Sequence, residues 1–482
     1  MCNGVESVII FEKEISEYYN QPYDAMYNDL LAIKKDEYAV DDQIVITAYK
    51  KTDKSIWKHF YEIVWWLDIP TFFIHIKSND DNVRKYIHEF CHDDINFEKT
   101  GSITVFERPD SFCITPFITA EVDVNGSIKP CCVIQTNPNY PNINNTTLDA
   151  AYQSELFQKI RQEFTNGHYP EACSNCWKKE KVGITSQRQR DKELFKKEYY
   201  TTDIFQKPEI KHLDLKIGFR CNLKCRICSS SLSSAWYAED KKFQIVPPVH
   251  EIDYMVDAGK DFWINQIEKF DSVNSISMKG GEPLLDHTHL KMLEKLLHLG
   301  KKDVKIHYNT NGTIFPEKHL EILSKFDKVE FTLSIDNIGK KFEYERNGMP
   351  WEKVNLNLEK FSRLDKSKFQ INVYASISLL NILDLTETLE HASNFGISSE
   401  TGYVDDPAYF SILNIPINNR RYIIDYLESS PYERVREVSG RLKQDTYNNL
   451  NDEFWQKVHE IDRRRGQNFK ETYPEMAKIM SL

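Results

Sequence analysis

The feature that most constrains this chain's fold is a regular alternation of strand-like and helix-like segments between residues 212 and 379. Runs rich in β-branched and aromatic residues are separated by amphipathic stretches such as 289–299. Because a parallel pair of strands needs a long, usually helical connection, this alternation predicts an α/β barrel or part of one. The expected barrel strands are 212–219, 272–278, 304–309, 328–335 and 369–379.

The rest of the 482-residue chain divides into segments of different character. The first of them reads as a small α/β accessory domain that binds substrate or a partner, with strands expected at 42–49, 71–78 and 102–107 and helices at 55–67 and 83–91. The expected domains are this unit at 1–105, a cysteine-rich region at 106–185, a linker helix at 186–210, the barrel at 211–405 and a helical C-terminal region at 406–482.

The charge balance argues against a nucleic-acid partner. The chain has 62 basic and 73 acidic residues, a formal net charge of −11, whereas nucleic-acid binding favours a basic face. The basic stretch 178–197 is interrupted by acidic residues, and the basic stretch 462–466 is short. We therefore expect a solvated helix or linker at each.

No targeting or membrane segment is expected. The N-terminal residues lack a basic start followed by a long apolar run. The most apolar stretch, 63–76, contains Asp68 and Pro70 and is too short to span a bilayer. We therefore expect a cytoplasmic protein in which thiols stay reduced, so that the ten cysteines indicate metal or redox chemistry rather than disulfides.

Three cysteines follow the first expected barrel strand at close spacing. Cys221, Cys225 and Cys228 lie in the sequence GFRCNLKCRICSS, where barrel enzymes place their chemistry. Thiolates are the usual ligands of iron–sulfur clusters, which commonly take four, so three would leave one iron of a cubane open. The alternatives are a structural zinc site, which needs a fourth ligand from elsewhere, or three buried inert cysteines.

At these residues the chain resembles the radical SAM superfamily, whose hallmark is this C-x3-C-x2-C loop. The resemblance implies a partial (β/α)6 barrel holding a [4Fe–4S] cluster, whose open iron binds S-adenosylmethionine (SAM). It also implies reductive cleavage of SAM to a 5′-deoxyadenosyl radical, which abstracts a hydrogen atom from the substrate. Ile227 stands where the family usually has an aromatic residue that meets the adenine.

Three further motifs fit the same family. Gly280, Gly281 and Glu282 match its GGEP motif, in which the glutamate holds the methionine ammonium of SAM. Ser334 and Arg346 resemble a pair that grips the carboxylate and ribose, a role that suits the planar donor fork of arginine. Asn311 lies in a TNG turn that the family places near the nucleoside, although a plain Asn-Gly turn has the same sequence.

The cysteines upstream of the barrel form a second pattern. A C-x12-G-x4-C spacing and a later C-x2-C resemble the SPASM or twitch region that binds auxiliary iron–sulfur clusters, although that region usually follows the barrel. The resemblance implies one auxiliary [4Fe–4S] cluster, with a four-cysteine zinc site as the alternative. The candidate ligands are Cys113, Cys131 or its neighbour Cys132, Cys173 and Cys176, while Cys2 and Cys91 are expected to be ordinary cysteines.

The resemblance also suggests a class of reaction. With one auxiliary cluster as electron acceptor, we expect oxidation or cross-linking of a peptide, with flavodoxin or ferredoxin as electron donor. The alternatives are a dehydrogenase or epimerase of a sugar or aminocyclitol, and a noncatalytic iron–sulfur or zinc scaffold. The catalytic base stays unassigned, because the residues near expected strand ends are as suited to packing as to catalysis; these are Lys279, Tyr308, Tyr374 and Tyr403.

Overall fold

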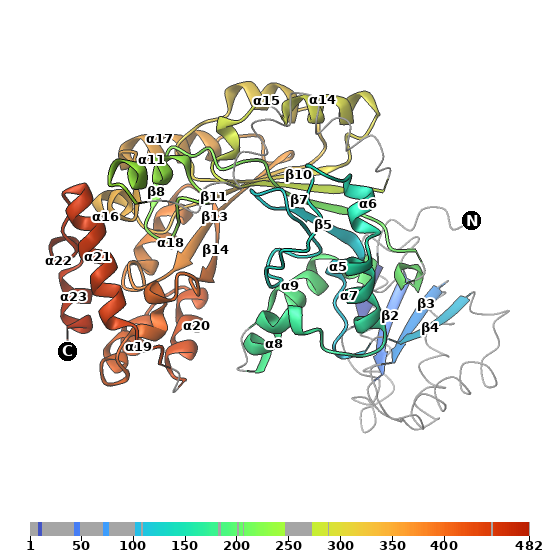
Figure 1. Cartoon of the computed structure of the whole chain (residues 1–482), viewed down its shortest axis with the longest axis horizontal. Helices are drawn as coiled ribbons and strands as arrows, with labels where there is room; N and C mark the ends of the chain where they lie inside the picture. Colours follow the sequence, from blue (N-terminus) through green and yellow to red (C-terminus); the bar gives the residue numbers. More distant parts are fainter. Residues whose placement is uncertain are drawn as a thin grey trace. The chain divides into compact units, whose positions relative to one another are not determined.

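The computed structural model describes residues 109–181, 185–199, 202–205, 207–245, 272–287, 289–444 and 447–481, and the backbone of four earlier strands (Figure 1). The helices expected at 55–67 and 83–91, and the residues Cys2 and Cys91, lie outside the described residues. Chain contacts define two compact units, which we describe separately: residues 1–119, 130–140 and 152–210, and residues 120–129, 141–151 and 211–482.

The N-terminal strands form a parallel sheet. β1 (Val8–Phe11), β2 (Gln43–Ala48), β3 (Thr71–Ile76) and β4 (Ser102–Glu107) lie side by side in chain order. Three of them coincide with the strands expected from the sequence, and β1 is an addition. Their β-branched and aromatic side chains suit a pleated sheet.

The second unit is built on an eight-stranded sheet with the order β14-β13-β11-β10-β9-β7-β5-β6. All neighbours from β7 to β14 are parallel, which confirms the partial (β/α)6 barrel. These strands are β7 (His212–Lys216), β9 (Ser275–Lys279), β10 (Lys305–Thr310), β11 (Val329–Ser334), β13 (Phe369–Ile377) and β14 (Ser398–Tyr403). The remaining two, β5 (Thr119–Val122) and β6 (Ile128–Lys129), form an antiparallel hairpin that comes from the cysteine-rich region of the sequence.

Amphipathic helices connect the parallel strands. They are α14 (Leu290–His298), α15 (Glu317–Leu323), α17 (Trp351–Ser362) and α18 (Leu385–Asn394), and Figure 1 shows α14, α15 and α17 along one side of the sheet. Residues on one face of each strand are buried and apolar, such as Leu213 and Leu215 of β7 and Ile276 and Met278 of β9. The alternate residues, which point to the other face, are mostly polar.

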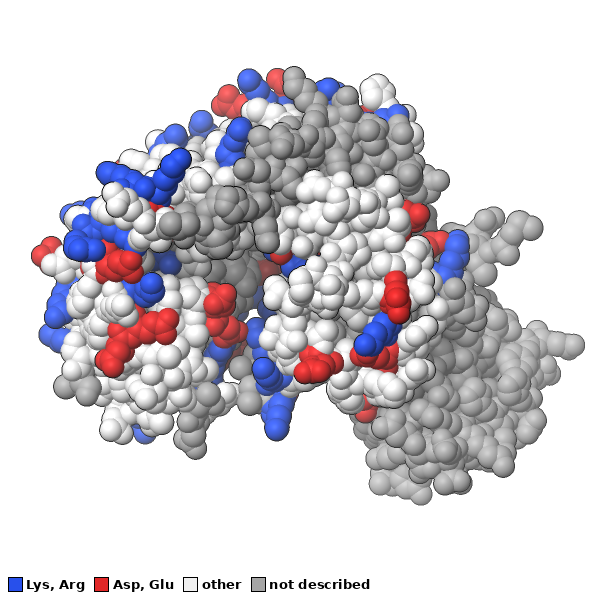
Figure 2. Space-filling view, viewed as in Figure 1, with Lys and Arg blue, Asp and Glu red and all other residues white. Residues whose placement is uncertain are grey.

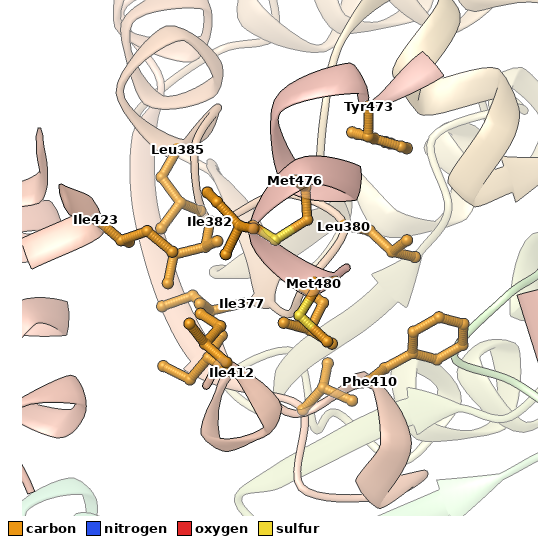
Figure 3. Packing of buried hydrophobic residues seen from close by; sticks show 14 of the residues in the cluster. Ile377, Leu380, Ile382, Leu385, Phe410, Ile412, Ile423, Tyr473, Met476 and Met480 are labelled. Atoms are coloured by element: carbon orange, nitrogen blue, oxygen red, sulfur yellow. The ribbon is translucent and has the colours of Figure 1, made fainter. Parts of the chain in front are cut away.

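The C-terminal region is helical, as expected, and it packs against the barrel. Its main helices are α19 (Arg420–Glu428), α20 (Glu433–Leu442), α21 (Asn451–Arg465), α22 (Phe469–Thr472) and α23 (Pro474–Met480). Figure 3 shows how they share one hydrophobic core with the end of β13 and the segment after it: Met476 and Met480 lie among Ile377, Leu380 and Ile382.

The expectation that 462–466 is a solvated basic stretch was wrong. The side chains of Arg464 and Arg465 are only 6% and 2% exposed. They form ion pairs with Asp240 and Glu239 of α11 (Ser234–Lys242), at 2.9 and 3.1 Å. Partners distant in the sequence thus allow these arginines to be buried.

The first unit has its own core around the upstream cysteines. Helix α5 (Thr115–Ile118) and helix α7 (Glu155–Thr165) contribute buried phenylalanines, among them Phe117 and Phe164. The core also contains Cys113 and contacts Cys131 and Cys173. The cysteines therefore lie against an apolar interior rather than in a solvent-exposed loop.

Charged side chains of both signs are interspersed over the face of the molecule that Figure 2 shows. Across the described part of the chain, none of the helices combines the length and apolar character that spanning a bilayer requires.

Candidate active site

The three cysteines of the C-x3-C-x2-C loop converge just beyond β7. Burial raises the pKa of the Cys225 thiol to about 12 and that of Cys228 to about 11, and in both cases the nearby Cys221 raises the pKa further. The loop is anchored by a two-stranded sheet in which β8 (Lys224–Cys225) pairs antiparallel with β12 (Arg346–Asn347). Three half-buried thiols, whose thiolate forms a bound metal would stabilise, fit an iron–sulfur cluster.

The glycine pair after β9 is required by this loop. The Gly281 N–H donates to the carbonyl of Gly218 at 2.8 Å. A Cβ on Gly280, whose φ is +115°, would lie 2.4 Å from that carbonyl oxygen, and one on Gly281 would lie 2.4 Å from the carbonyl oxygen of Arg220. We interpreted the glycines as making room for a ligand, and the structure adds a nearer cause, the close approach of the cysteine loop itself.

Arg346 lies between a buried carboxylate and the cysteine loop. Its Nη2 atom is 2.7 Å from Asp336, and its Nη1 atom is 3.8 Å from the Sγ of Cys225. The pair is buried, and the carboxylate holds the guanidinium in a fixed orientation. Asp336 was not singled out from the sequence, although it is the last residue of the SID motif. Ser334, the first residue of that motif, is the last residue of β11.

Asn311 joins the TNG turn to the cysteine loop. Its Nδ2 atom lies 3.8 Å from the Sγ of Cys221 and 3.0 Å from the Oδ1 of Asn222. The side-chain Oδ1 of Asn311 in turn accepts from the hydroxyl of Thr313 at 2.7 Å. This asparagine is therefore a built part of the site as well as a turn residue.

Glu282 is buried beneath the same turn. Its carboxylate accepts hydrogen bonds from the Thr310 hydroxyl at 2.8 Å, the Asn311 N–H at 2.7 Å and the Leu284 N–H at 3.1 Å. Burial raises the pKa of Glu282 to about 7 despite these donors. Two carboxylate oxygens can accept about four bonds, so these three donors do not use the full acceptor capacity of Glu282.

Ile227 is partly buried and packs against the C-terminal hydrophobic core. The expected contact with adenine is untested, and its packing explains why an aliphatic side chain is accommodated at this position.

A polar network crosses the face of the sheet opposite the helices. His307 of β10 is within hydrogen-bond distance of Ser277 at 3.2 Å and of Thr332 at 2.9 Å, so it joins three adjacent strands. Burial lowers the pKa of His307 to about 4. Further pairs extend the network over the sheet: His212–Ser275, Lys279–Asp214, Lys216–Glu121, Lys305–Glu330 and Asn372–Glu330.

The four residues near strand ends differ in their surroundings. Tyr308 is completely buried, stacks on Phe331 and bonds to His289 at 2.7 Å, so it is a packing residue of the core. Lys279 ends β9 and pairs with Asp214 on the polar face. Tyr374 lies within β13, close to Gly402, and the guanidinium of Arg441 lies 4.2 Å from the ring centroid of Tyr403.

In the first unit, the upstream cysteines line one small pocket. Its walls include Phe164, Trp177 and Arg188, together with Cys113, Cys131, Cys173 and Cys176. Cys132, by contrast, is exposed. Burial raises the pKa of the Cys173 thiol to about 12, and Cys176 beside it raises the value further. The sulfurs are close enough to interact, as ligands of one cluster must be.

The helix that follows the pocket was missed as part of this site. Residues 178–197 were expected to be a solvated helix or linker. Helix α9 (Gln187–Leu194) does form there, but its residue Asp191 and its N-cap Ser186 are buried. Arg188 pairs with Glu180 and donates from Nη1 to the carbonyls of Asp110 and Phe112 at 2.9 and 3.0 Å. The polar sequence of residues 178–197 does not indicate this role, because the backbone carbonyls that accept from Arg188 lie far away in the sequence.

Among the described residues, no three His, Cys, Asp or Glu side chains converge on the position of a single metal ion. A zinc ion bound by four cysteines would need its sulfurs about 2.3 Å from one centre. A cubane distributes its ligands over separate irons, so its cysteines stand farther apart than those around a single zinc ion.

Comparison with known proteins identifies two domains in this chain. A model described as the radical SAM superfamily matches residues 215–392, and one described as an iron–sulfur cluster-binding domain, SPASM, matches residues 113–177. An uncharacterized protein of Methanocaldococcus jannaschii is 26% identical over 195 residues, 39% of this chain and 61% of its own length.

Several solved structures are also similar, at low identity. Native anSMEcpe with bound AdoMet has a TM-score of 0.31 at 19% identity, covering 53% of this chain and 62% of that one. Streptococcus suis SuiB bound to S-adenosylmethionine has a TM-score of 0.32 at 18% identity, covering 59% and 60%. SuiB bound to its precursor peptide SuiA has a TM-score of 0.29 at 15% identity, covering 72% and 75%.

The two domain matches coincide with the two cysteine groups. The first includes Cys221, Cys225 and Cys228 and implies a [4Fe–4S] cluster and SAM, and the second spans Cys113 to Cys176 and implies auxiliary iron–sulfur binding. The chain therefore contains a radical SAM domain over residues 215–392 and, ahead of it, a SPASM iron–sulfur region over residues 113–177.

Proposed function

We propose that this protein is a radical SAM enzyme that cleaves SAM reductively and, with one auxiliary cluster, oxidises or cross-links a peptide. The observation that carries the first part is the meeting of Arg346 and Asn311 with the sulfurs of Cys225 and Cys221. A noncatalytic scaffold has no use for a buried arginine and a polar turn directed at its cluster ligands.

Each residue of the site has a role in this proposal. Cys221, Cys225 and Cys228 bind the cluster, which when reduced supplies the electron that breaks SAM into methionine and a 5′-deoxyadenosyl radical. Arg346, fixed by Asp336, binds the carboxylate of SAM through charge-assisted hydrogen bonds. Glu282 uses its remaining acceptor capacity for the ammonium, and Ser334, Asn311 and Ile227 meet the nucleoside.

The substrate then loses two electrons in two steps. It first gives a hydrogen atom to the radical, which becomes 5′-deoxyadenosine. An auxiliary cluster held by the upstream cysteines would accept one electron from the remaining substrate radical, and a base would take one proton, which would give an unsaturated or cross-linked product. We place the auxiliary cluster on Cys113, Cys131, Cys173 and Cys176, because these line one pocket while Cys132 is exposed.

A sugar or aminocyclitol is the second candidate substrate, and the polar face of the sheet favours it. His307, Lys279 and Lys305 lie there in a network of ion pairs and hydrogen bonds that offers donors and acceptors to a hydroxyl-rich ligand. A polar peptide side chain is compatible with the same face. A one-electron donor such as flavodoxin or ferredoxin, in a reducing compartment such as the cytoplasm, completes the proposal.

The test is production of 5′-deoxyadenosine by anaerobically reconstituted protein with dithionite as reductant. We expect turnover that is lost in the C221A/C225A/C228A variant. Deuterated peptides and deuterated polyols then separate the two substrate classes, because only a true substrate transfers deuterium into 5′-deoxyadenosine. Absence of 5′-deoxyadenosine from protein with a full iron content would contradict the enzymatic proposal in favour of a scaffold.

A further inference from the structure

The C-terminal helices reach the small sheet that carries both a cluster ligand and the arginine proposed for SAM. We propose that Asp462 and Tyr473 are positioning residues for SAM binding, because they hold the β8–β12 sheet on which Cys225 and Arg346 face each other. The inference rests on the proposed function of that site. Both residues lie beyond the matched radical SAM domain, which ends at residue 392.

The first anchor is Arg226, which stands in the sequence between the proposed cluster ligands Cys225 and Cys228. Its side chain is fully buried, and its guanidinium lies 3.5 Å from the ring centroid of Tyr344. The Nε atom donates to the Tyr344 carbonyl at 3.0 Å, and Nη2 is 2.5 Å from the Oδ1 of Asp462. The backbone N–H of Arg226 donates to the Glu345 carbonyl at 2.8 Å.

Asp462 connects that arginine to the end of α21. Its Oδ1 also accepts from the Tyr344 hydroxyl at 2.8 Å, and its Oδ2 accepts from the Phe469 N–H at 2.7 Å. One carboxylate thus binds the cysteine loop, the residue two before Arg346 and the start of α22. An aspartate that serves three segments at once fixes their relative positions.

The second anchor holds the residue next to Arg346. Glu345 is 4% exposed, and its Oε1 accepts from the Tyr473 hydroxyl at 2.7 Å and from Asn337 Nδ2 at 3.1 Å. The ring of Tyr473 also packs against Tyr344, with centroids 5.4 Å apart. The C-terminal region therefore holds both residues that precede Arg346.

The opposite side of the cysteine loop is held from the same helix. Trp236 donates from Nε1 to the Cys225 carbonyl at 2.7 Å, and the Arg465 guanidinium lies 4.4 Å from its ring centroid. Arg465 also pairs with Glu239, which binds Lys224 of β8 at 2.5 Å. Residues of α21 and of the segment after it thus reach the loop from two directions.

This support is needed because the β8–β12 sheet is too short to hold itself. It consists of two residue pairs, Cys225 with Arg346 and Lys224 with Asn347. Isolated two-stranded ribbons are marginally stable in water. A ligand-binding group that shifts by about 1 Å from the reacting centre loses much of its contribution to binding and catalysis. The anchors therefore determine how well Arg346 and the cluster bind one SAM molecule together.

The experiment compares D462N and Y473F with V458A, a matched control. Val458 lies on α21 with its side chain completely buried in the C-terminal core, so V458A destabilises the same helix without contacting the loop. The readouts are iron and sulfide content, the dissociation constant for SAM by equilibrium dialysis, and the change that SAM causes in the EPR signal of the reduced cluster. D462E, which retains a carboxylate, serves as the rescue variant.

We expect D462N and Y473F to bind SAM about tenfold more weakly, about 1.4 kcal/mol, at unchanged iron content, with an altered or absent SAM-dependent EPR change. V458A should match the parent, and D462E should recover part of the affinity. SAM binding by D462N and Y473F equal to that of the parent would overturn the proposal. A loss of SAM affinity in D462N and Y473F no larger than the loss in V458A, compared at equal unfolding midpoints, would also overturn it.

A measurement without SAM separates this inference from the proposed function. Amide hydrogen exchange in residues 222–228 of the iron-free protein should be faster in D462N than in V458A. The D462N variant holds the Arg226 side chain less firmly, so the hydrogen bond from the Arg226 N–H to the Glu345 carbonyl should open more often. Faster exchange with no SAM binding by the parent would support the anchors and contradict the proposed function. Equal exchange in D462N and V458A would contradict the anchors, whatever the parent does with SAM.

Discussion

The Nη1 atom of Arg346 lies 3.8 Å from the Sγ of Cys225, its register partner across the β8–β12 sheet. One residue of the pair belongs to the cysteine loop and the other follows the SID motif by ten positions. A cation at a cluster sulfur stabilises the reduced, more negative state of a cluster, and the same cation suits the carboxylate of SAM. We therefore propose that the pair couples SAM binding to the electrostatics of the cluster.

The first prediction concerns Arg346. R346K should weaken SAM binding by about 10- to 100-fold, since the loss of one or two charge-assisted hydrogen bonds costs about 1.5–3 kcal/mol. Lysine retains the charge but cannot direct a planar fork at Asp336 and a ligand at once. Equilibrium dialysis measures the effect. R421K, which changes a largely exposed arginine paired with Asp425, is the control, and equal affinities for the two variants would exclude a role for Arg346 in SAM binding.

The number of clusters gives the second prediction. Fully reconstituted protein should contain about eight irons per chain, and C221A/C225A/C228A should retain about four. Iron and acid-labile sulfide assays provide the counts. Zinc in place of iron in the triple variant would overturn the upstream cluster, while loss of all iron would show that the two cysteine groups do not assemble independently.

The adjacent cysteines Cys131 and Cys132 allow a third test. Cys131 lines the pocket with the other upstream cysteines, whereas Cys132 is exposed. C131A in the C221A/C225A/C228A background should therefore lose the remaining four irons, about one cluster, while C132A in the same background retains them. The reverse result would transfer the ligand role to Cys132.

Gly281 supports a fourth prediction. G281A should impair assembly of the radical SAM cluster, because its Cβ would lie 2.4 Å from the Arg220 carbonyl oxygen and displace the loop that carries Cys221. G440A is the control, since no atom lies within 4 Å of a Cβ at this position in α20, and it should stabilise the protein by about 0.5–1 kcal/mol. Absorption spectra of reconstituted protein, compared with circular dichroism, separate cluster loss from unfolding.

The fifth prediction is a pH dependence that His307 causes. Its pKa is lowered by burial from 6.5 to about 4, so the folded protein keeps it neutral. Below pH 6.5 the unfolded chain binds a proton that the folded chain does not, and stability falls by up to about 1.4 kcal/mol per pH unit until about pH 4. The free energy of unfolding in urea should thus decrease by roughly 2 kcal/mol more for the parent than for H307Q between pH 6.5 and 5. Parallel curves would contradict this assignment.

The sequence predicted the elements whose side chains repeat with a clear period. Five barrel strands and the helix at Leu290–His298 were expected because apolar residues alternate or recur there. Strand β14 was missed, since its sequence SSETGY has few apolar residues and is recognisable only by its partner β13. Local periodicity carries no information about a strand that is stabilised mainly by pairing.

The candidate site, too, was predicted only in part from the sequence. Cys221, Arg346 and Asn311 were expected from motifs, and the structure brings them together. Arg226 and Asp462 were not found, because the partners are 236 residues apart and each is an ordinary charged residue until it is buried. Long-range ion pairs of this kind depend on the tertiary structure, and no short pattern in the chain identifies them.

The hairpin of β5 and β6 has a consequence for any attempt to divide this chain. The hairpin is encoded before residue 130, yet it completes the barrel sheet next to β7. A fragment that starts at the expected domain boundary, residue 211, would still pair β7 with β9, but it would leave the hydrogen-bonding groups on the β5 side of β7 open to pairing with another copy. The radical SAM region of this protein should consequently self-associate when it is expressed without the upstream segment, even though its own motifs are complete.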